Sequence, residues 1–357
     1  MKISDNNINR SSNNFDALRL IAASLVVIGH SSAILLNKPL EADVFNIIFG
    51  IPAALFGVII FFIISGFLVA RSWENKKDVL DFLLARVLRI FPAAIVVVLL
   101  SVFVLGIAMT YLPVSEYLAS GQTHRYLQNI TLYRMYYYLP GVFESNPSGP
   151  SVNGSLWTLP YEFTCYLLLI CAGVFSLLKN KWAALSIFLI LCFSYLFFSE
   201  PLDKVVIPVI GIDFKNFYML MLYFFAGALY YLFRHDIVFS FSWLLIAAAN
   251  YGMIKFTLFP ELLYVIIIPY LVLFFAFSKR IILNKVGKRG DFSYGLFLYS
   301  YPVQQLIVYL MPVKTGLFVM IILSLLFTLP FAVLSWIFIE SPALNLRKKI
   351  NLLHLKR

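Results

Sequence analysis

The sequence contains few of the residues that build disulfide frameworks or metal sites. Of its 357 residues, only three are cysteine and four are histidine. Cys165, Cys171 and Cys192 all fall inside long apolar stretches, and their spacing matches no metal-ligand pattern. We interpret them as small, buried apolar side chains, and we expect the function to need no metal.

Other features of secreted and repeat-built proteins are missing as well. The polar start, Met1–Phe15, is not the charged region of a signal peptide, because many apolar stretches follow the first one. We find no internal repeat, which argues against a transporter assembled from inverted repeats. We also expect no appended soluble domain, because no polar stretch is long enough to form one.

Long apolar stretches make up most of the chain. Hydrophobic residues account for 61% of it, and the mean hydropathy is +0.88. A helix needs about 20 apolar residues to cross a bilayer. The sequence therefore predicts an all-α integral membrane protein with about ten transmembrane helices. The candidate spans are Ala17–Leu36, Ile47–Ala70, Val87–Tyr111, Leu156–Leu178, Trp182–Phe198, Tyr218–Phe233, Ile237–Phe256, Leu262–Phe277, Phe292–Met311 and Leu317–Phe338.

The net charge of +11 would suggest a nucleic-acid partner if the charges were evenly spread. Most lysines and arginines instead fall in the segments that lie on the same side as the N-terminus. The positive-inside rule then predicts both termini in the cytoplasm of a multi-pass protein of the inner or plasma membrane. We expect a lipid bilayer and no nucleic acid as a partner, although an anionic cytoplasmic ligand could use part of the positive charge.

These spans define the expected organisation of the chain. Residues 1–16 form a cytoplasmic segment, 17–338 the transmembrane domain, and 339–357 a basic cytoplasmic tail. The longest outer segment, 112–155, contains Tyr133 and the run of tyrosines at 136–138. Those tyrosines fit an aromatic belt at the membrane surface and a surface that stacks on sugar rings equally well. Within the second span, Ser65 and Gly66 form a small pair that lets helices approach closely.

His30 lies in an apolar stretch, where an ionisable side chain marks a functional site by default. Arg19 precedes it by eleven residues, or about 16 Å of helix. That length is comparable to an extended pantetheine arm. One helix could therefore hold a nucleotide phosphate at its inner end and a base near a thioester further out. The alternatives are a histidine satisfied by a neighbouring helix and an arginine that anchors the helix end.

Arg86 and Arg89 lie at the inner end of the third predicted span. Residues three apart share a helix face, so the two guanidinium groups would form a fork suited to phosphate. The alternative is a pair that only sets the topology.

Glu162 lies a few residues into the fourth predicted span, at a depth similar to that of His30. A carboxylate beside an imidazole holds its tautomer and stabilises its charged form. We therefore predict His30 as the general base and Glu162 as the residue that orients it. The alternative is a carboxylate paired structurally with an arginine or a tyrosine.

These segments, in this order, resemble the membrane acyltransferase-3 family, which O-acetylates carbohydrates. Each motif alone is weak, but six in order over nearly the whole chain are strong. The motifs are Arg19…His30, Ser65–Leu68, Arg86…Arg89, Ser155–Glu162, Ser293–Leu298 with Phe297 in place of a tyrosine, and Glu340-Ser-Pro342. One position departs from the pattern. Many relatives have a histidine where this chain has Ser300, so a role for that histidine does not carry over.

The resemblance implies a donor, an acceptor and roles for residues. The donor would be cytoplasmic acetyl-CoA, bound by Arg19, Arg86 and Arg89, with Asp16 positioning Arg19 three residues along the same helix face. The acceptor would be a hydroxyl of a surface polysaccharide or its lipid-linked precursor. Our candidates for binding this carbohydrate are Asn153, Trp157 and Tyr161. The alternatives are a glycan polymerase, which would want its basic residues outside, and a flippase or transporter of lipid-linked sugars, which would have charges on several helices.

Overall fold

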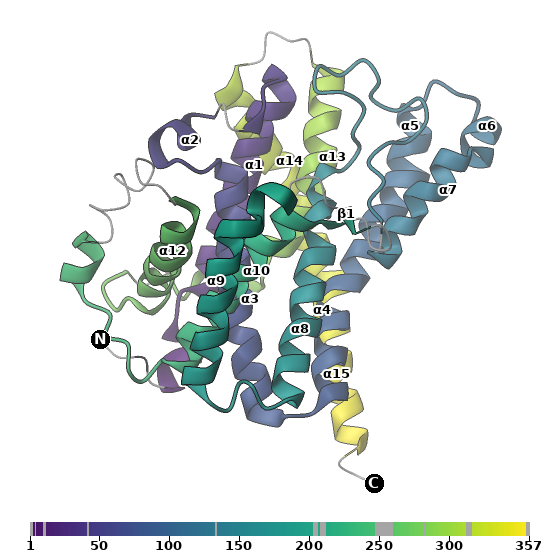
Figure 1. The fold of residues 1–357 in the computed structure, drawn as a ribbon. Helices are drawn as coiled ribbons and strands as arrows, with labels where there is room; N and C mark the ends of the chain where they lie inside the picture. The colour runs from purple at the N-terminus through teal and green to yellow at the C-terminus, as the bar shows by residue number, and fades with distance from the viewer. Residues whose placement is uncertain are drawn as a thin grey trace.

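The computed structural model describes residues 3, 5–9, 12–40, 43–132, 134–202, 206–207, 212–246, 260–281, 283–311 and 316–354. In these ranges the chain forms a bundle of helices, most of which run along a common direction (Figure 1). The helices are α1 (Phe15–Leu36), α2 (Val44–Phe49), α3 (Ala53–Lys76), α4 (Val79–Leu100), α5 (Ile107–Met109), α6 (Val114–Ala119), α7 (Gly121–Leu127), α8 (Leu159–Val174), α9 (Lys181–Leu202), α10 (Phe214–Leu232), α12 (Pro260–Phe277), α13 (Ser293–Leu310), α14 (Leu317–Ser335) and α15 (Ser341–His354). Short helical turns are η1 (Asp5–Ile8), η4 (Ser101–Gly106), η5 (Gln128–Thr131), η6 (Gly154–Thr158), η7 (Val286–Arg289) and η8 (Trp336–Glu340).

The fold is helical throughout the described residues except for one small ladder. Strands β1 (Val206–Ile207) and β2 (Ile212–Asp213) pair antiparallel just before α10. Two residues per strand add a local turn to the loop and do not alter the helical class of the fold.

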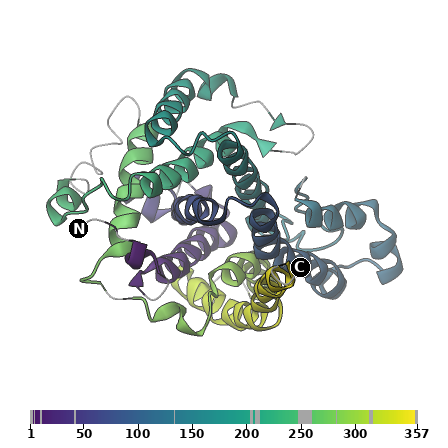
Figure 2. The same cartoon turned by 90° about the horizontal axis from the view of Figure 1, so that it is seen from below.

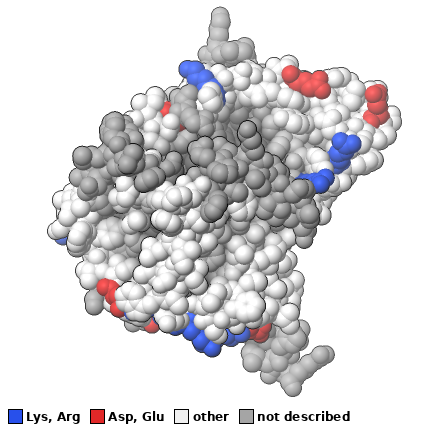
Figure 3. All heavy atoms as spheres, viewed as in Figure 1, with Lys and Arg blue, Asp and Glu red and all other residues white. Residues whose placement is uncertain are grey.

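Five helical stretches among the described residues are long and apolar enough to cross a membrane. They are Phe15–Leu36, Ala53–Lys76, Val79–Met109, Gly154–Val174 and Leu317–Arg347. On the face drawn in Figure 3, the described atoms between the charged side chains at the lower edge and those near the top are largely uncharged. The chain is therefore a membrane protein, as its composition predicts.

Four further predicted spans coincide with α9, α10, α12 and α13, which do not meet the same length and hydropathy requirement over their described residues. In α13 the reason is polar content, since Ser300, Gln304 and Gln305 are buried within it. The remaining predicted span, Ile237–Phe256, lies largely outside the described residues, as does Tyr133. A count of ten spans and the cytoplasmic position of both termini stay predictions.

Two predicted span boundaries are wrong, and capping explains both. The second span was expected from Ile47, but 44–49 form the separate helix α2, which ends at Gly50 in the left-handed conformation (φ 73°) before α3 begins. The third span was expected from Val87, but α4 begins at Val79. The side chain of Asp78 accepts hydrogen bonds from the backbone N–H groups of Leu80 and Asp81, so the helix extends into the charged segment.

Helices α1 and α3 occupy the middle of the bundle, with later helices around them (Figure 2). Close approach depends on glycines, as predicted for Gly66. A Cβ atom on Gly66 would lie 1.8 Å from the carbonyl oxygen of Phe224, and one on Gly227 would lie 2.2 Å from that of Ile63. These contacts fix α3 directly against α10, because no larger residue fits at either position.

The outer segment 112–155 is folded over the described part of its length. Asn129 binds both backbone groups of Tyr136, and Asn146 donates to the backbone oxygen and the side-chain oxygen of Gln305 on α13. Both asparagines are buried. The segment is therefore fixed to the second half of α13 through amide hydrogen bonds.

Candidate functional site

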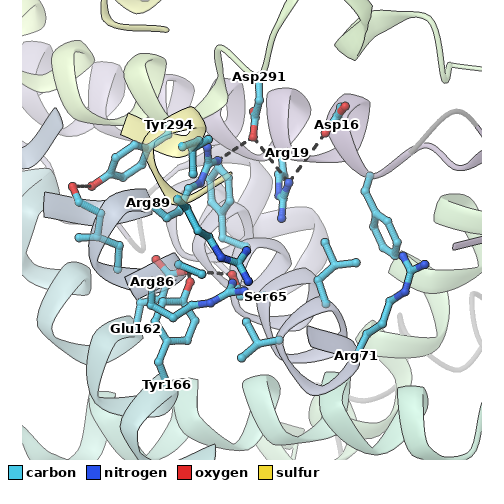
Figure 4. Close-up of a pocket in the computed structure, with 18 of the residues that line it drawn as sticks. Asp16, Arg19, Ser65, Arg71, Arg86, Arg89, Glu162, Tyr166, Asp291 and Tyr294 are labelled. Carbon is cyan, nitrogen blue, oxygen red and sulfur yellow. Dashed lines mark hydrogen bonds and ion pairs between the residues drawn. The ribbon is translucent and has the colours of Figure 1, made fainter. Parts of the chain in front are cut away.

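A cavity of about 400 Å³ lies at one end of the bundle, between α1, α3, α4, α8, α13 and α15 (Figure 4). We call it the arginine cavity. Five arginines line it, namely Arg19, Arg71, Arg86, Arg89 and Arg347, together with the acidic residues Asp16, Glu162 and Asp291. Its walls therefore carry more positive than negative side chains. Ile8 and Asn13 from the N-terminal segment, and Leu344 from α15, complete the lining.

Asp291 joins two of these arginines. Its Oδ2 lies 2.6 Å from Nη2 of Arg89 and 3.6 Å from Nη1 of Arg19. Arg19 also lies 3.8 Å from Asp16, and Arg89 lies 3.7 Å from Glu340. Burial alone would raise the pKa of Asp291, but the two arginines outweigh burial and hold that pKa below its usual range. The ionised carboxylate thus holds α1 and α4 against the start of α13.

Arg86 has no carboxylate within 4 Å among the described residues, in contrast to Arg89. Its Nη2 donates to the hydroxyl of Ser72 at 3.2 Å, and its guanidinium lies 5.5 Å from the centre of the Tyr166 ring. Its Nε is buried without a hydrogen-bond partner. A buried donor left unpaired is costly, so this group is well suited to bind an anionic ligand.

Glu162 reaches the same cavity from α8. Its Oε1 accepts hydrogen bonds from the hydroxyls of Ser65, at 2.7 Å, and Tyr166 (Figure 4). Among the described residues no hydrogen bond joins Glu162 to His30. The predicted partnership with His30 stays a prediction, and the structure gives the carboxylate two hydroxyl partners of its own.

His30 lies further along α1 and does not line the arginine cavity. Its ring packs edge-on against Tyr301 of α13, with 5.1 Å between the ring centres, and its Nδ1 is buried without a hydrogen-bond partner. Beside it, the Gln304 side chain donates to the hydroxyl of Ser31 at 2.7 Å. We call His30, Ser31, Tyr301 and Gln304 the His30 layer. This layer places hydroxyl and amide groups close to an imidazole whose Nδ1 has no hydrogen-bond partner among the described residues.

The three predicted carbohydrate-binding residues have structural contacts. Asn153 is fully buried, and its amide donates to the backbone oxygen of Leu298 on α13. The ring of Trp157 packs edge-on against Tyr161, whose hydroxyl accepts from the backbone N–H of Asp213. These contacts order the outer end of α8, and the binding role of the three residues stays a prediction.

Comparison with known proteins identifies the protein family to which the chain belongs. A family model described as an acyltransferase domain, Acyl_transf_3, matches residues 12–337. The chain belongs to this acyltransferase family. The match covers the His30 layer and the helices that form the arginine cavity except α15, which begins after the end of the match.

Two curated relatives match the chain. An O-acetyl transferase of Shigella phage Sf6 is 29% identical over 351 residues, which are 92% of this chain and 95% of the relative. Nodulation protein 10 of Rhizobium leguminosarum bv. viciae is 36% identical over 163 residues, which are 44% of this chain and 43% of the relative. No solved structure matches the acyltransferase significantly.

The structure brings together Arg19, Asp16, Arg86, Arg89 and Glu162, all predicted from the sequence as site residues. The sequence analysis missed two acidic residues that hold this set in place. Asp291 and Glu340 are buried and ion-paired with Arg89. A signal was available, because acidic residues number only 17 in this chain and Glu340 falls within a quoted motif. A carboxylate next to a predicted span is unfavourable unless a cation pairs with it.

Proposed function

We propose that this acyltransferase moves an acetyl group from cytoplasmic acetyl-CoA to a hydroxyl of a surface polysaccharide or its lipid-linked precursor. The observation that carries the proposal is Arg86, a buried guanidinium without a carboxylate partner in a cavity lined by four more arginines. Coenzyme A is rich in phosphate, and guanidinium groups bind phosphate through charge-assisted hydrogen bonds. The O-acetyl transferase named among the relatives supports the acetyl group and the oxygen acceptor.

The position of the cavity supports a cytoplasmic donor. Asn13 near the N-terminus and Arg347 near the C-terminus both line it. The distribution of lysine and arginine predicts that both ends of the chain lie in the cytoplasm. A donor that enters from that side would reach Arg86 and Arg89 first and extend its pantetheine arm along α1 toward His30.

His30 is the proposed general base. It would take the proton of the acceptor hydroxyl while the hydroxyl oxygen attacks the carbonyl carbon of the thioester. The carbon–sulfur bond then breaks, and the proton passes from His30 to the departing thiolate. The products are an O-acetyl ester and free coenzyme A. The buried, unpartnered Nδ1 of His30 supports this role, because the imidazole has a nitrogen available for the proton.

The other residues have proposed supporting roles. Arg19, positioned by Asp16, and Arg89 complete the phosphate site. Glu162 favours the charged form of His30, either directly or through groups between them. Trp157 and Tyr161, at the outer end of α8, are proposed to contact the sugar together with Asn153.

The proposal is tested by measuring donor binding and the product separately. We expect acetyl-CoA to stabilise the detergent-purified protein against heat. We also expect mass spectrometry of the surface glycan to show an added acetyl mass only when the gene is present. Absence of acetyl-CoA binding, or an identical glycan with and without the gene, would contradict the proposal.

A further inference from the structure

A second, much smaller cavity of about 30 Å³ adjoins the arginine cavity. The two cavities share Phe61, Glu162 and Tyr294, so they meet at the Glu162 carboxylate. Beyond these residues the smaller cavity is lined by Val58, Phe62, Thr158, Leu159 and Phe297. We call it the narrow chamber. A single water needs about 10–15 Å³ of such space, so the chamber admits a group of only a few heavy atoms.

The course of α13 places the narrow chamber next to the His30 layer. Phe297 lines the chamber, and Tyr301, which packs on the ring of His30, follows it by four residues. Residues four apart lie on the same face of a helix, about 6 Å apart along its axis. The chamber is therefore about one helical turn away from His30 on the α13 side.

Helix α3 independently places the narrow chamber one helical turn from His30. Val58 lines the chamber, and Ala54 precedes it by four residues on the same face. Ala54 packs against Gly29, the neighbour of His30 on α1, and a Cβ atom on Gly29 would lie 2.6 Å from the Ala54 nitrogen. Two separate helices thus place the chamber one turn inward from His30, between that residue and the arginine cavity.

The chamber wall is apolar and closed by aromatic rings. Phe297 and Phe61 meet edge to face, with 6.0 Å between the ring centres, and Phe62 and Leu159 are buried beside them. Glu162 and Tyr294 lie where the chamber meets the arginine cavity, and Thr158 is the remaining polar residue of the lining. Such a space suits a short apolar group whose polar attachment points back toward the arginines.

We infer that the narrow chamber holds the acyl group of the donor thioester and that Phe297 limits this group to acetyl. The inference rests on the proposed function, since it assumes coenzyme A in the arginine cavity. With coenzyme A in the arginine cavity, a thioester near Glu162 and a methyl group beside Phe297 follow one path toward His30. A longer acyl chain meets the Phe297 ring and the buried side chains around it.

The test measures binding of coenzyme A and of its acetyl, propionyl and butyryl thioesters to the detergent-purified acyltransferase by calorimetry. In the wild-type protein we expect acetyl-CoA to bind at least tenfold more tightly than butyryl-CoA. Phe297→Ala should reduce this preference by roughly fourfold for each methylene that gains room. The matched control is Phe225→Ala, which enlarges a different apolar cavity on α10 and should leave the preference unchanged.

A substitution that makes the chamber smaller tests the opposite change. Its result does not depend on whether the protein still folds with an enlarged cavity. Val58→Ile adds one methylene to the chamber wall and should weaken acetyl-CoA relative to free coenzyme A. The failures of the two proposals differ. If free coenzyme A does not bind the wild-type protein, the proposed function fails. If coenzyme A binds but neither Phe297→Ala nor Val58→Ile changes the affinities of the thioesters relative to free coenzyme A, the chamber does not hold the acyl group.

Discussion

The arginine cavity contains charged side chains, whereas the His30 layer contains neutral hydroxyl and amide groups beside the imidazole. The cavity holds five arginines and three acidic residues, and Asp291 ties two of the arginines together. The His30 layer contacts hydroxyl and amide groups, and one imidazole nitrogen has no partner. Fixed charges suit the binding of an anion, whereas a neutral environment leaves an imidazole free to accept a proton. The same two helices, α1 and α13, contribute to both.

The largest effect is expected at His30. His30→Ala should lower acyl transfer by about 10²–10⁴-fold, the usual contribution of general acid–base catalysis, while acetyl-CoA binding stays within a factor of two or so. Mass spectrometry of the glycan, at matched protein abundance in the membrane, measures the first quantity, and calorimetry the second. His235→Ala, at an exposed histidine outside both regions, is the matched control. Wild-type acetylation in the His30 variant would show that the His30 layer is not the catalytic region.

The next effect concerns the ion pairs of the arginine cavity. Asp291→Asn leaves Arg19 and Arg89 without their shared buried carboxylate. Removing one partner of a buried pair typically costs about 3–5 kcal/mol, so the thermal unfolding midpoint in detergent should fall clearly. Asp236→Asn is the control, because its pair with Lys181 is largely exposed and such pairs contribute about 0–1 kcal/mol. Equal shifts for both variants would show that the cavity charges do not hold the helices together.

The sequence predicted the cavity arginines better than it predicted their partners. Arg86 and Arg89 share a helix face by spacing alone, so their approach to one cavity follows from α-helical periodicity. Asp291 and Glu340 reach Arg89 from the start of α13 and from η8, and that contact depends on how distant helices pack. Local spacing contains no information on such packing.

The start of α4 and the contacts of Asn153 show a second limit of prediction from sequence. Asp78 caps α4, which begins at Val79, eight residues before the predicted start, because the Asp78 side chain accepts hydrogen bonds from the first backbone N–H groups of the helix. Asn153 lies two residues before the Ser155–Glu162 motif, and its amide donates to the backbone of α13. A motif identifies a position that matters to the family fold and does not separate a structural contact from a binding contact.

Arg86 and Arg89 offer a sharper comparison within the cavity. Arg86→Ala should weaken acetyl-CoA binding by about tenfold to a hundredfold, equivalent to about 1.5–3 kcal/mol for a charge-assisted contact, with little loss of thermal stability. Arg89→Ala should weaken binding and also destabilise the protein, because Asp291 and Glu340 lose their shared cation. Calorimetry and thermal unfolding separate the two results. Arg234→Ala is the control, since Arg234 does not line the cavity. An unchanged dissociation constant in Arg86→Ala would leave that residue as a topology anchor.

The smallest effect is expected at Glu162, which lies on the border between the two regions. Glu162→Gln keeps the shape of the side chain and removes its charge, so donor binding should change little while turnover falls about tenfold, less than the roughly 10²–10⁴-fold expected for loss of the general base itself. Glu162 accepts hydrogen bonds from Ser65 and Tyr166, and both bonds are available to a glutamine oxygen. A loss of turnover would therefore reflect the missing charge.

A double-mutant cycle then decides how that charge acts. If Glu162 supports His30, the variant with both His30→Ala and Glu162→Gln should be hardly slower than His30→Ala alone, because residues that act as a unit are not additive. Additive losses would separate the two residues and leave Glu162 as a carboxylate that orders Ser65 and Tyr166 at the entrance of the narrow chamber. In that case Glu162 acts with the residues of the arginine cavity and not with the His30 layer.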